Sequence, residues 1–394
     1  MMTQNSPLVK MLKFSERKRC TLLGVGPMSK NCVDTAVKLS NTYETPLMLI
    51  ASRRQIDSAY FGGGYVNNWT TETFARYVRE IDQKSMVVLA RDHGGPWQHP
   101  RELESKMNLA EAMKSCKKSF EADIDAGFSI IHIDPSVDPY SKPSVDQILD
   151  RIFELYLHCW RYAQKTGKTI AFEIGTEEQS GGTNSPQDLE YTLQRIQNFC
   201  LENALPMPLF VVIQSGTRVM ETRNVGTFES PVRIVNELPA EILIPMMIDV
   251  CGKYGVKMKE HNTDYLSNEA LRWHPRLGIH AANVAPEFGV AETRALFEIM
   301  KRFELKDHIS RFIELTEQSK KWSKWILPES STDANSRSLI AGHYIFSSSE
   351  GSRLISELNL VLKNHGIDLN EYLKLAIEDS ICRYLRNFRL VDSL

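Results

Sequence analysis

The segment VVLARDHGGPW (87–97) decides the fold, because a run of apolar residues leads directly into polar ones. The apolar residues do not alternate with polar ones, which is typical of a parallel strand that is covered on both faces. Asp92 and His93 fall where this strand ends, and the glycines that follow leave room for another backbone or a ligand. In barrel enzymes the chemistry lies at the carboxyl ends of such strands.

Seven further apolar runs occur in the first 290 residues, and the stretches between them carry helix signals. The eight predicted strands span residues 20–27, 46–52, 86–92, 129–135, 169–175, 209–216, 257–262 and 276–282. A capping box at Ser144 begins a helix that ends at Gly167, and Ser185 and Ser230 each precede a proline at a predicted helix start. SNEALRW (267–273) leaves room for only a brief helix. Eight such alternations predict an α/β fold of the (β/α)8 TIM barrel type.

A doubly wound open sheet is the alternative fold. It would normally show a glycine-rich dinucleotide loop after an early strand. GVGPMS (24–29) has a proline and lacks the third glycine, so that motif is absent. We therefore assign residues 15–300 to the barrel.

Residues 301–394 are predicted to form a helical C-terminal extension. The sequence predicts irregular structure over 305–349 and helices near 350–363 and 369–388. The extension either packs on the barrel, forms a subunit contact or covers the mouth of the site. GHYIFSSSEGSR (342–353) gathers hydroxyl groups and an arginine at a helix start, which indicates an anion site or a plain helix cap.

The composition of the 394 residues narrows the class of protein. A net charge of −2 gives no electrostatic footprint for nucleic acid or an acidic membrane. The seven cysteines have no C-x-x-C spacing, which favours reduced thiols in the cytoplasm over a disulfide frame or a zinc knuckle. No run of 18 apolar residues and no signal-peptide core occurs, so we expect a soluble, intracellular protein.

Four histidines, His93, His132, His261 and His280, lie in or just after predicted strands, each near a carboxylate or amide. Histidine is the commonest transition-metal ligand, although some of the four could be ordinary hydrogen-bonded histidines. Two or three imidazoles with a carboxylate suit a divalent metal: Zn²⁺ with an open position, or Mn²⁺ if more oxygen ligands join. Such a metal would polarise a carbonyl and stabilise an enediolate. We predict His93, His261 and His280 as the metal ligands.

Other polar residues at the predicted strand ends are candidates for proton transfer or substrate contacts. Asp92 is expected to move a proton, and Glu177 to project into the mouth, whereas Glu173 is either a ligand or a buried, paired acid. Gln214 and its neighbours offer recognition of hydroxyl groups or of an anion. Four arginines could neutralise a phosphate, although each is individually more typical of a surface or helix-facing residue: Arg53, Arg54, Arg218 and Arg223.

Six motifs recur together in a fixed order along the chain. They are ASRRQIDSAYFGGGY (51–65), RDHGGPWQ (91–98), HIDPS (132–136), EIGTEEQSGG (173–182), QSGT (214–217) and EHNTDY (260–265). This set resembles the tagatose-bisphosphate aldolase "non-catalytic subunit" family, members of which have also been called tagatose-6-phosphate kinases. Relatives of that family include ketose and ketose-phosphate 4-epimerases. The resemblance implies a barrel related to class II aldolases, with a divalent metal at the strand ends in active members.

The resemblance also implies roles for particular residues. Matching positions imply catalytic roles for Asp92, Glu177 and Asp264. The implied substrate-binding residues are Gln55, Asp134, Gln214, Gly216 and Asn283, the last from its place beyond the eighth predicted strand.

Two departures from the family pattern indicate a divergent branch. HAANVAP (280–286) replaces a Lys-Val-Gly-Pro type run, and Arg91-Asp92-His93-Gly94 replaces Gly-Asp-His-Leu. A lysine in the first run would contact an anion, whereas His280 is the better metal ligand. The substrate is therefore not necessarily the family's usual sugar phosphate.

The functional prediction is metal-dependent retro-aldol/aldol chemistry on a ketose or ketose phosphate. A 4-epimerase is favoured, because no separate half-barrel or partner is evident; the alternatives are a class II aldolase and a non-catalytic stabilising subunit of one. The retained Asp92, His93, Glu177 and His261 argue against the subunit. A kinase lacks support, because neither a P-loop nor a kinase glycine-rich loop is present. The expected partners are a small sugar or sugar phosphate and either a second copy of the chain or an aldolase subunit.

Overall fold

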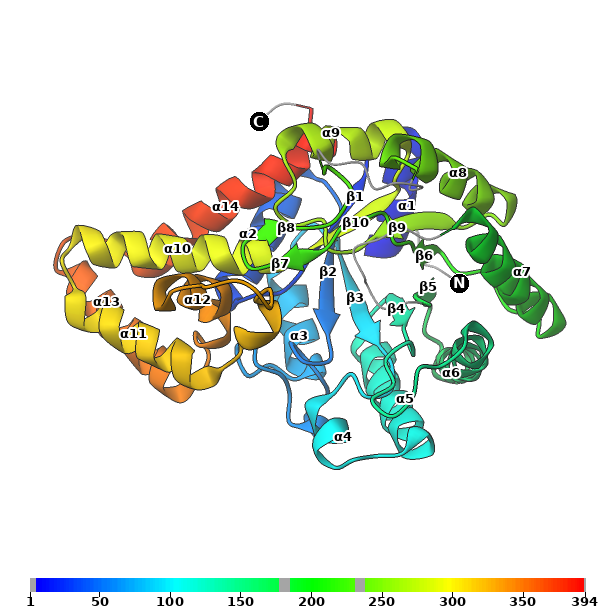
Figure 1. The fold of residues 1–394 in the computed structure, drawn as a ribbon, viewed down its shortest axis with the longest axis horizontal. Coiled ribbons are helices and arrows are strands. Elements are labelled where there is room, and N and C mark those ends of the chain that lie inside the picture. Colours follow the sequence, from blue (N-terminus) through cyan, green and yellow to red (C-terminus); the bar gives the residue numbers. More distant parts are fainter. Residues whose placement is uncertain (1–4, 177–184, 231–237, 393–394) are drawn as a thin grey trace.

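Eight parallel strands close into a barrel in the computed structural model, which describes residues 5–176, 185–230 and 238–392 (Figure 1). The strands are β1 (Leu22–Val25), β2 (Leu47–Ser52), β3 (Val87–Gly94), β4 (Ile130–Ile133), β5 (Ala171–Ile174), β6 (Phe210–Val212), β9 (Lys257–Glu260) and β10 (Ala281–Val284). Strand β1 pairs with both β2 and β10, which closes the ring. The predicted TIM barrel is confirmed, and an open sheet is excluded.

The strands are buried over almost their whole length, as continuous apolar runs predict. Helices surround them: α2 (Lys30–Tyr43), α3 (Thr71–Ile81), α4 (Pro100–Glu104), α5 (Leu109–Ala126), α6 (Val145–Thr166), α7 (Pro186–Glu202), α8 (Ala240–Lys253), α9 (Asn268–Leu277) and α10 (Pro286–Arg302). Helix α1 (Pro7–Arg17), a short turn η1 (Ala59–Phe61) and a two-stranded ribbon of β7 (Val219–Met220) and β8 (Arg223–Asn224) complete this part of the chain.

The helix boundaries follow from their caps. Ser144 accepts a hydrogen bond from the amide of Gln147, and Gly167 ends α6 with a φ of 67°. Ser185 caps α7 in the same way. These predicted boundaries are confirmed, whereas the predicted helix after Ser230 lies at residues 231–237, outside the described residues.

The last strand differs from its predicted bounds of 276–282. Helix α9 continues to Leu277, and Gly278 ends it in the left-handed region, so β10 begins only at Ala281. His280 therefore precedes the strand. Its ring Nδ1 accepts a hydrogen bond from the amide of Met258, near the amino end of β9 (3.1 Å). This places His280 toward the end of the barrel opposite the strand carboxyl ends.

The C-terminal extension is more helical than predicted. Residues 305–349, expected to be irregular, contain α11 (Lys306–Ser319), α12 (Ala334–Ala341) and the short turns η2 (Ser323–Trp325) and η3 (Gly342–Tyr344). The two expected helices follow as α13 (Ser349–Lys363) and α14 (Leu369–Asn387). Helices α11, α12 and α13 gather with α10 on one side of the barrel (Figure 1).

Helix α14 packs directly on the barrel. Its residues Ile377, Ile381 and Leu385, and Phe388 directly after it, are buried in the same apolar cluster as the strands. Arg383 and Tyr384 of this helix both bond Glu287 at the start of α10. Helix α14 and the barrel thus share one apolar cluster, whereas a second cluster lies between α10, α11, α13 and the start of α14. Among the described residues, no helix is long and apolar enough to span a membrane.

Candidate active site

An irregularity in strand β3 lets the side chains of Asp92 and His93 point into the same site. The register of β3 against β4 shifts between Arg91 and Gly94, and His93 has a φ of 42°. Glycines make this path possible: a Cβ at Gly94 would come within 2.6 Å of the His132 carbonyl, and one at Gly95 within 2.0 Å of the Asp134 carbonyl. The bulge allows two neighbouring side chains to contribute to one site.

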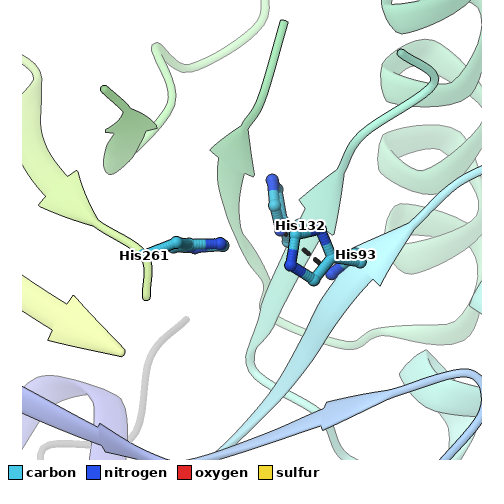
Figure 2. Close-up of side chains that lie close together, drawn as sticks. All are labelled: His93, His132 and His261. Carbon is cyan, nitrogen blue, oxygen red and sulfur yellow. Dashed lines mark hydrogen bonds between the residues drawn. The ribbon is translucent and has the colours of Figure 1, made fainter. Parts of the chain in front are cut away.

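Three imidazoles meet at the carboxyl ends of β3, β4 and β9 (Figure 2). The ring centroids lie 5.5 Å apart for His93 and His132, 5.0 Å for His93 and His261, and 5.1 Å for His132 and His261. The backbone amide of His93 donates a hydrogen bond to Nδ1 of His132 (3.1 Å). His93 and His261, both predicted as metal ligands, thus lie close together.

Two carboxylates complete the cluster. Asp92 Oδ1 lies 3.7 Å from His132 Nδ1 and 3.8 Å from His261 Nε2. Glu173 Oε1 accepts a bond from His261 Nε2 (2.9 Å), and its other oxygen pairs with the buried amine of Lys259 (2.6 Å). Glu173 is therefore a buried, paired acid that also touches the histidines.

The charges in this cluster are set by competition between burial and neighbours. Burial alone would raise the pKa of Asp92, but the imidazoles of His93, His132 and His261 hold it well below its usual range. Burial would also raise the pKa of Glu173, but Lys259 and the histidines lower it to about 2. Burial would lower the pKa of His93, but Asp92 and Asp134 raise it to about 9. For His261 burial prevails over the neighbouring Asp92 and Glu173 and lowers the pKa.

Buried hydrogen bonds fix the histidines in place. Asp134 accepts a hydrogen bond from His93 Nδ1 (2.9 Å) and so orients that ring. Asp134 itself is not among the residues that line the cavity. Thr217 donates to the backbone carbonyl of His261 (2.7 Å). The preceding residue, Glu260, is held by Ser215, Thr263 and His274.

The cluster opens into a cavity of about 910 Å³, a size typical of small-molecule sites. Residues of the extension also line it, so the extension covers part of the mouth. Of the predicted site residues, the lining contains Gln55, Asp92, His93, His261, Asp264 and Asn283.

The other residues predicted for substrate binding or catalysis differ in their contacts and in whether they line the cavity. Asn283 donates to Asp92 Oδ1 (3.1 Å) and so positions it. Asp264 accepts from the amides of Ala285 and Glu287 at the start of α10; burial, with the charge of Glu287, raises its pKa to about 7. Gln214 is buried outside the cavity lining, as is Gly216, whose carbonyl accepts from Phe228. Glu177 lies outside the described residues.

The structure corrects the third predicted histidine. His280 lies at the other end of β10, and His132 takes its place beside His93 and His261. A Cβ at Gly175 would lie 2.7 Å from His132 Nε2, so the glycine that follows β5 makes room for this ring. The available signal was the position of His132 in HIDPS, inside a strand rather than before one.

The donor set fits a divalent metal ion. Two overlapping groups of side chains could hold an ion: His93, His132 and His261, and Asp92, His132, Glu173 and His261. Within each group, every residue offers one nitrogen or oxygen that lies within 4.8 Å of those of the others. Two ligands of one metal are separated by about 4 Å or less. Among the described residues, buried His261 Nδ1 has no hydrogen-bond partner, while Nε2 of the same ring bonds Glu173. Three imidazoles with a carboxylate suit Zn²⁺ or a related cation.

The sequence matches a known family over most of its length. The model of the family described as D-tagatose-1,6-bisphosphate aldolase subunit GatZ/KbaZ-like matches residues 10–338. The chain belongs to this family. The GatZ/KbaZ-like match runs past the barrel and through η2 into α12, so it includes part of the extension that lines the cavity. A comparison with curated proteins found no match.

Solved structures share the fold at low identity. One from Sinorhizobium meliloti, described as a "probable tagatose 6 phosphate kinase", superposes with a TM-score of 0.73 at 17% identity, over 93% of this chain and 100% of that one. A fructose-bisphosphate aldolase from Campylobacter jejuni has a TM-score of 0.52 at 12% identity, over 98% and 95%. At such identities the likeness concerns the barrel fold alone.

Proposed function

We propose that this GatZ/KbaZ-like chain is a metal-dependent enzyme that cleaves and re-forms the C3–C4 bond of a ketose or ketose phosphate, as a 4-epimerase. One observation carries the proposal: three imidazoles and two carboxylates meet at one barrel mouth, beside a cavity of about 910 Å³. A purely structural barrel has no physical need for such a cluster. Family membership supports the carbohydrate substrate.

The residues have separable roles in this proposal. His93, His132 and His261 would hold the cation, which supplies positive charge that polarises the substrate carbonyl. Asp92 lies beside the rings of His132 and His261 and acts as the base, and Asn283 orients it by donating a hydrogen bond to Oδ1. Asp134 and Glu173 orient the rings of His93 and His261.

The reaction begins when the Asp92 carboxylate accepts the proton of the C4 hydroxyl. The C4–O electron pair forms an aldehyde as the C3–C4 bond breaks, and the electrons of that bond move to the C2 carbonyl oxygen. This leaves an enediolate and an aldehyde. Attack on the other face of the turned aldehyde, with the proton returned from Asp92, gives the 4-epimer. The extension favours this outcome over fragment release, because it covers part of the cavity.

The second candidate is a subunit that stabilises a catalytic aldolase, which is favoured by the family's description as an aldolase subunit. A panel of ketoses and ketose phosphates followed by NMR separates the two candidates. The metal-loaded enzyme should interconvert C4 epimers. Asp92→Asn should keep the metal and lose turnover by about 100-fold or more, because an amide cannot accept the proton. A chain that binds an aldolase and converts no member of the panel would favour the subunit.

A further inference from the structure

Five cations line the cavity without a carboxylate partner. They come from three separate segments: Arg54 after β2, Arg101 in α4, and Lys320, Lys321 and Lys324 around η2. Within the described part of the chain, none of them forms an ion pair within 4.0 Å, whereas buried Arg53 beside them pairs with both Asp57 and Glu102. Among the described residues that line the cavity, the acids are Asp92, Asp264 and Glu104. Such a concentration of positive charge contrasts with a chain whose net charge is −2.

The segment that carries Lys324 is fixed over the mouth. The carbonyl of Trp325 accepts a bond from the amide of Glu221 (2.7 Å), and its indole donates to the hydroxyl of Tyr344 (3.2 Å). The ring of Tyr344 packs against Tyr65 of the β2 loop, with centroids 4.6 Å apart. The Lys324 amine lies over the Trp325 ring, 4.6 Å from its centroid. Lys324 is thus held toward the cavity by aromatic contacts rather than by an acid.

We propose that Arg54, Arg101 and Lys324, with Lys321 beside them, form a subsite for a phosphate monoester on the substrate. This deepens the proposed function, on which it rests, because it makes the substrate a ketose phosphate. Arginine and lysine are the usual partners of phosphate oxygens, and charge-assisted bonds to them are about twice as strong as neutral ones.

The electrostatics of Lys324 agree with this arrangement. The surrounding protein and the positive charges of Arg54 and Lys321 lower the pKa of its amine to about 8. A bound phosphate dianion would raise that pKa again. Binding at pH 8 should therefore be accompanied by uptake of a fraction of a proton.

Isothermal calorimetry at pH 8 tests the subsite through binding alone. The probes are fructose 6-phosphate, fructose and inorganic phosphate, and the variants are Arg54→Met, Lys324→Met and, as control, Lys363→Met at the exposed end of α13. Wild type should bind fructose 6-phosphate at least 10-fold more tightly than fructose. Each cavity variant should lose about 10-fold or more of that affinity, and Lys324→Met should also abolish the proton uptake. The control should do neither.

The outcomes separate this inference from the proposed function. Equal binding of fructose and fructose 6-phosphate, or unchanged affinity in both cavity variants, would overturn the subsite. Tight binding of inorganic phosphate alone, insensitive to Arg54→Met and Lys324→Met, would overturn it too. If phosphate-dependent binding is lost in the variants while no ketose is converted, the subsite stands and the epimerase fails.

Discussion

At the scale of single residues, the backbone conformation of His93 allows the side chains of Asp92 and His93 to reach the same site. In an unbroken strand neighbouring side chains point to opposite faces, so Asp92 and His93 would be separated. The register shift in β3 and the positive φ of His93 remove this restriction. Such a conformation costs about 1–3 kcal/mol and persists only where its surroundings fix it. The bonds of His93 to His132 and Asp134 do so here.

Because His132 replaces His280 in the proposed ligand set, alanine substitutions at these two positions form a matched pair. His132→Ala removes a proposed ligand and should weaken divalent-metal binding by about 100-fold or more, since outer partners of ligands alone change affinity by about 10–100-fold. His280→Ala removes only a ring that accepts from Met258 and should leave metal affinity unchanged. Equilibrium dialysis with Zn²⁺ measures both. Loss of metal in His280→Ala with retention in His132→Ala would restore the original assignment.

The sequence could predict the residue types at this site better than their places. Asp92, His93 and His261 follow directly from strand ends, and all three line the cavity. His280 could not be placed correctly, because the last strand begins at Ala281 and not at the predicted residue 276, and a five-residue error along a strand moves a side chain by about 17 Å. Gly278 was the signal for the true boundary. The partners of Asp134 and Asp264 come from distant segments and leave no local trace.

At the scale of single elements, helix α10 carries a buried carboxyl group, Glu292, which makes the free energy of unfolding depend on pH. Burial raises the pKa of Glu292 from 4.5 to about 7, despite bonds to Ser29 and Asn31, and Asp34 adds to the rise. The folded state then binds the proton more tightly than the unfolded chain. The contribution of this carboxyl group to stability is therefore fully present below pH 4.5 and is lost as the pH rises through about 7.

Glu292→Gln should remove this loss, because the amide stays neutral at every pH. At pH 8 the variant should be more stable than wild type by up to about 3 kcal/mol, and at pH 4.5 nearly equal. Urea unfolding at both pH values measures the difference. Glu298→Gln, at an exposed position of the same helix, is the control. Parallel pH profiles for Glu292→Gln and wild type would contradict the assignment.

Helix α14 offers a second matched pair at this scale. Leu385 is 0% exposed and lies in the barrel core, whereas Leu375 of the same helix is 60% exposed. Leu385→Ala should lower the free energy of unfolding by about 2–5 kcal/mol, because it leaves a cavity. Leu375→Ala should change it by less than about 0.5 kcal/mol. Equal effects would mean that α14 is not part of the barrel's core.

On the scale of the whole molecule, the extension completes the cavity that the barrel begins. The barrel could be predicted from eight apolar runs, since each strand is a local pattern. The cover over its mouth could not, because η2 lies in a stretch whose polar sequence predicts irregular structure. Trp325 of η2 accepts a bond from Glu221, and Tyr344 of η3 packs on Tyr65, so these contacts join segments that are far apart along the chain. Barrel and extension together line the cavity of the candidate site.

The most direct test of the account is C4-epimer interconversion measured by NMR as a divalent cation is returned to chelator-treated protein. Turnover of a ketose phosphate should be absent without metal and should rise to saturation near one ion per chain. His261→Ala should stay inactive across the same titration, because one of the three imidazoles is lost. Full turnover by His261→Ala in chelator-treated buffer would contradict the metal mechanism and favour a stabilising subunit.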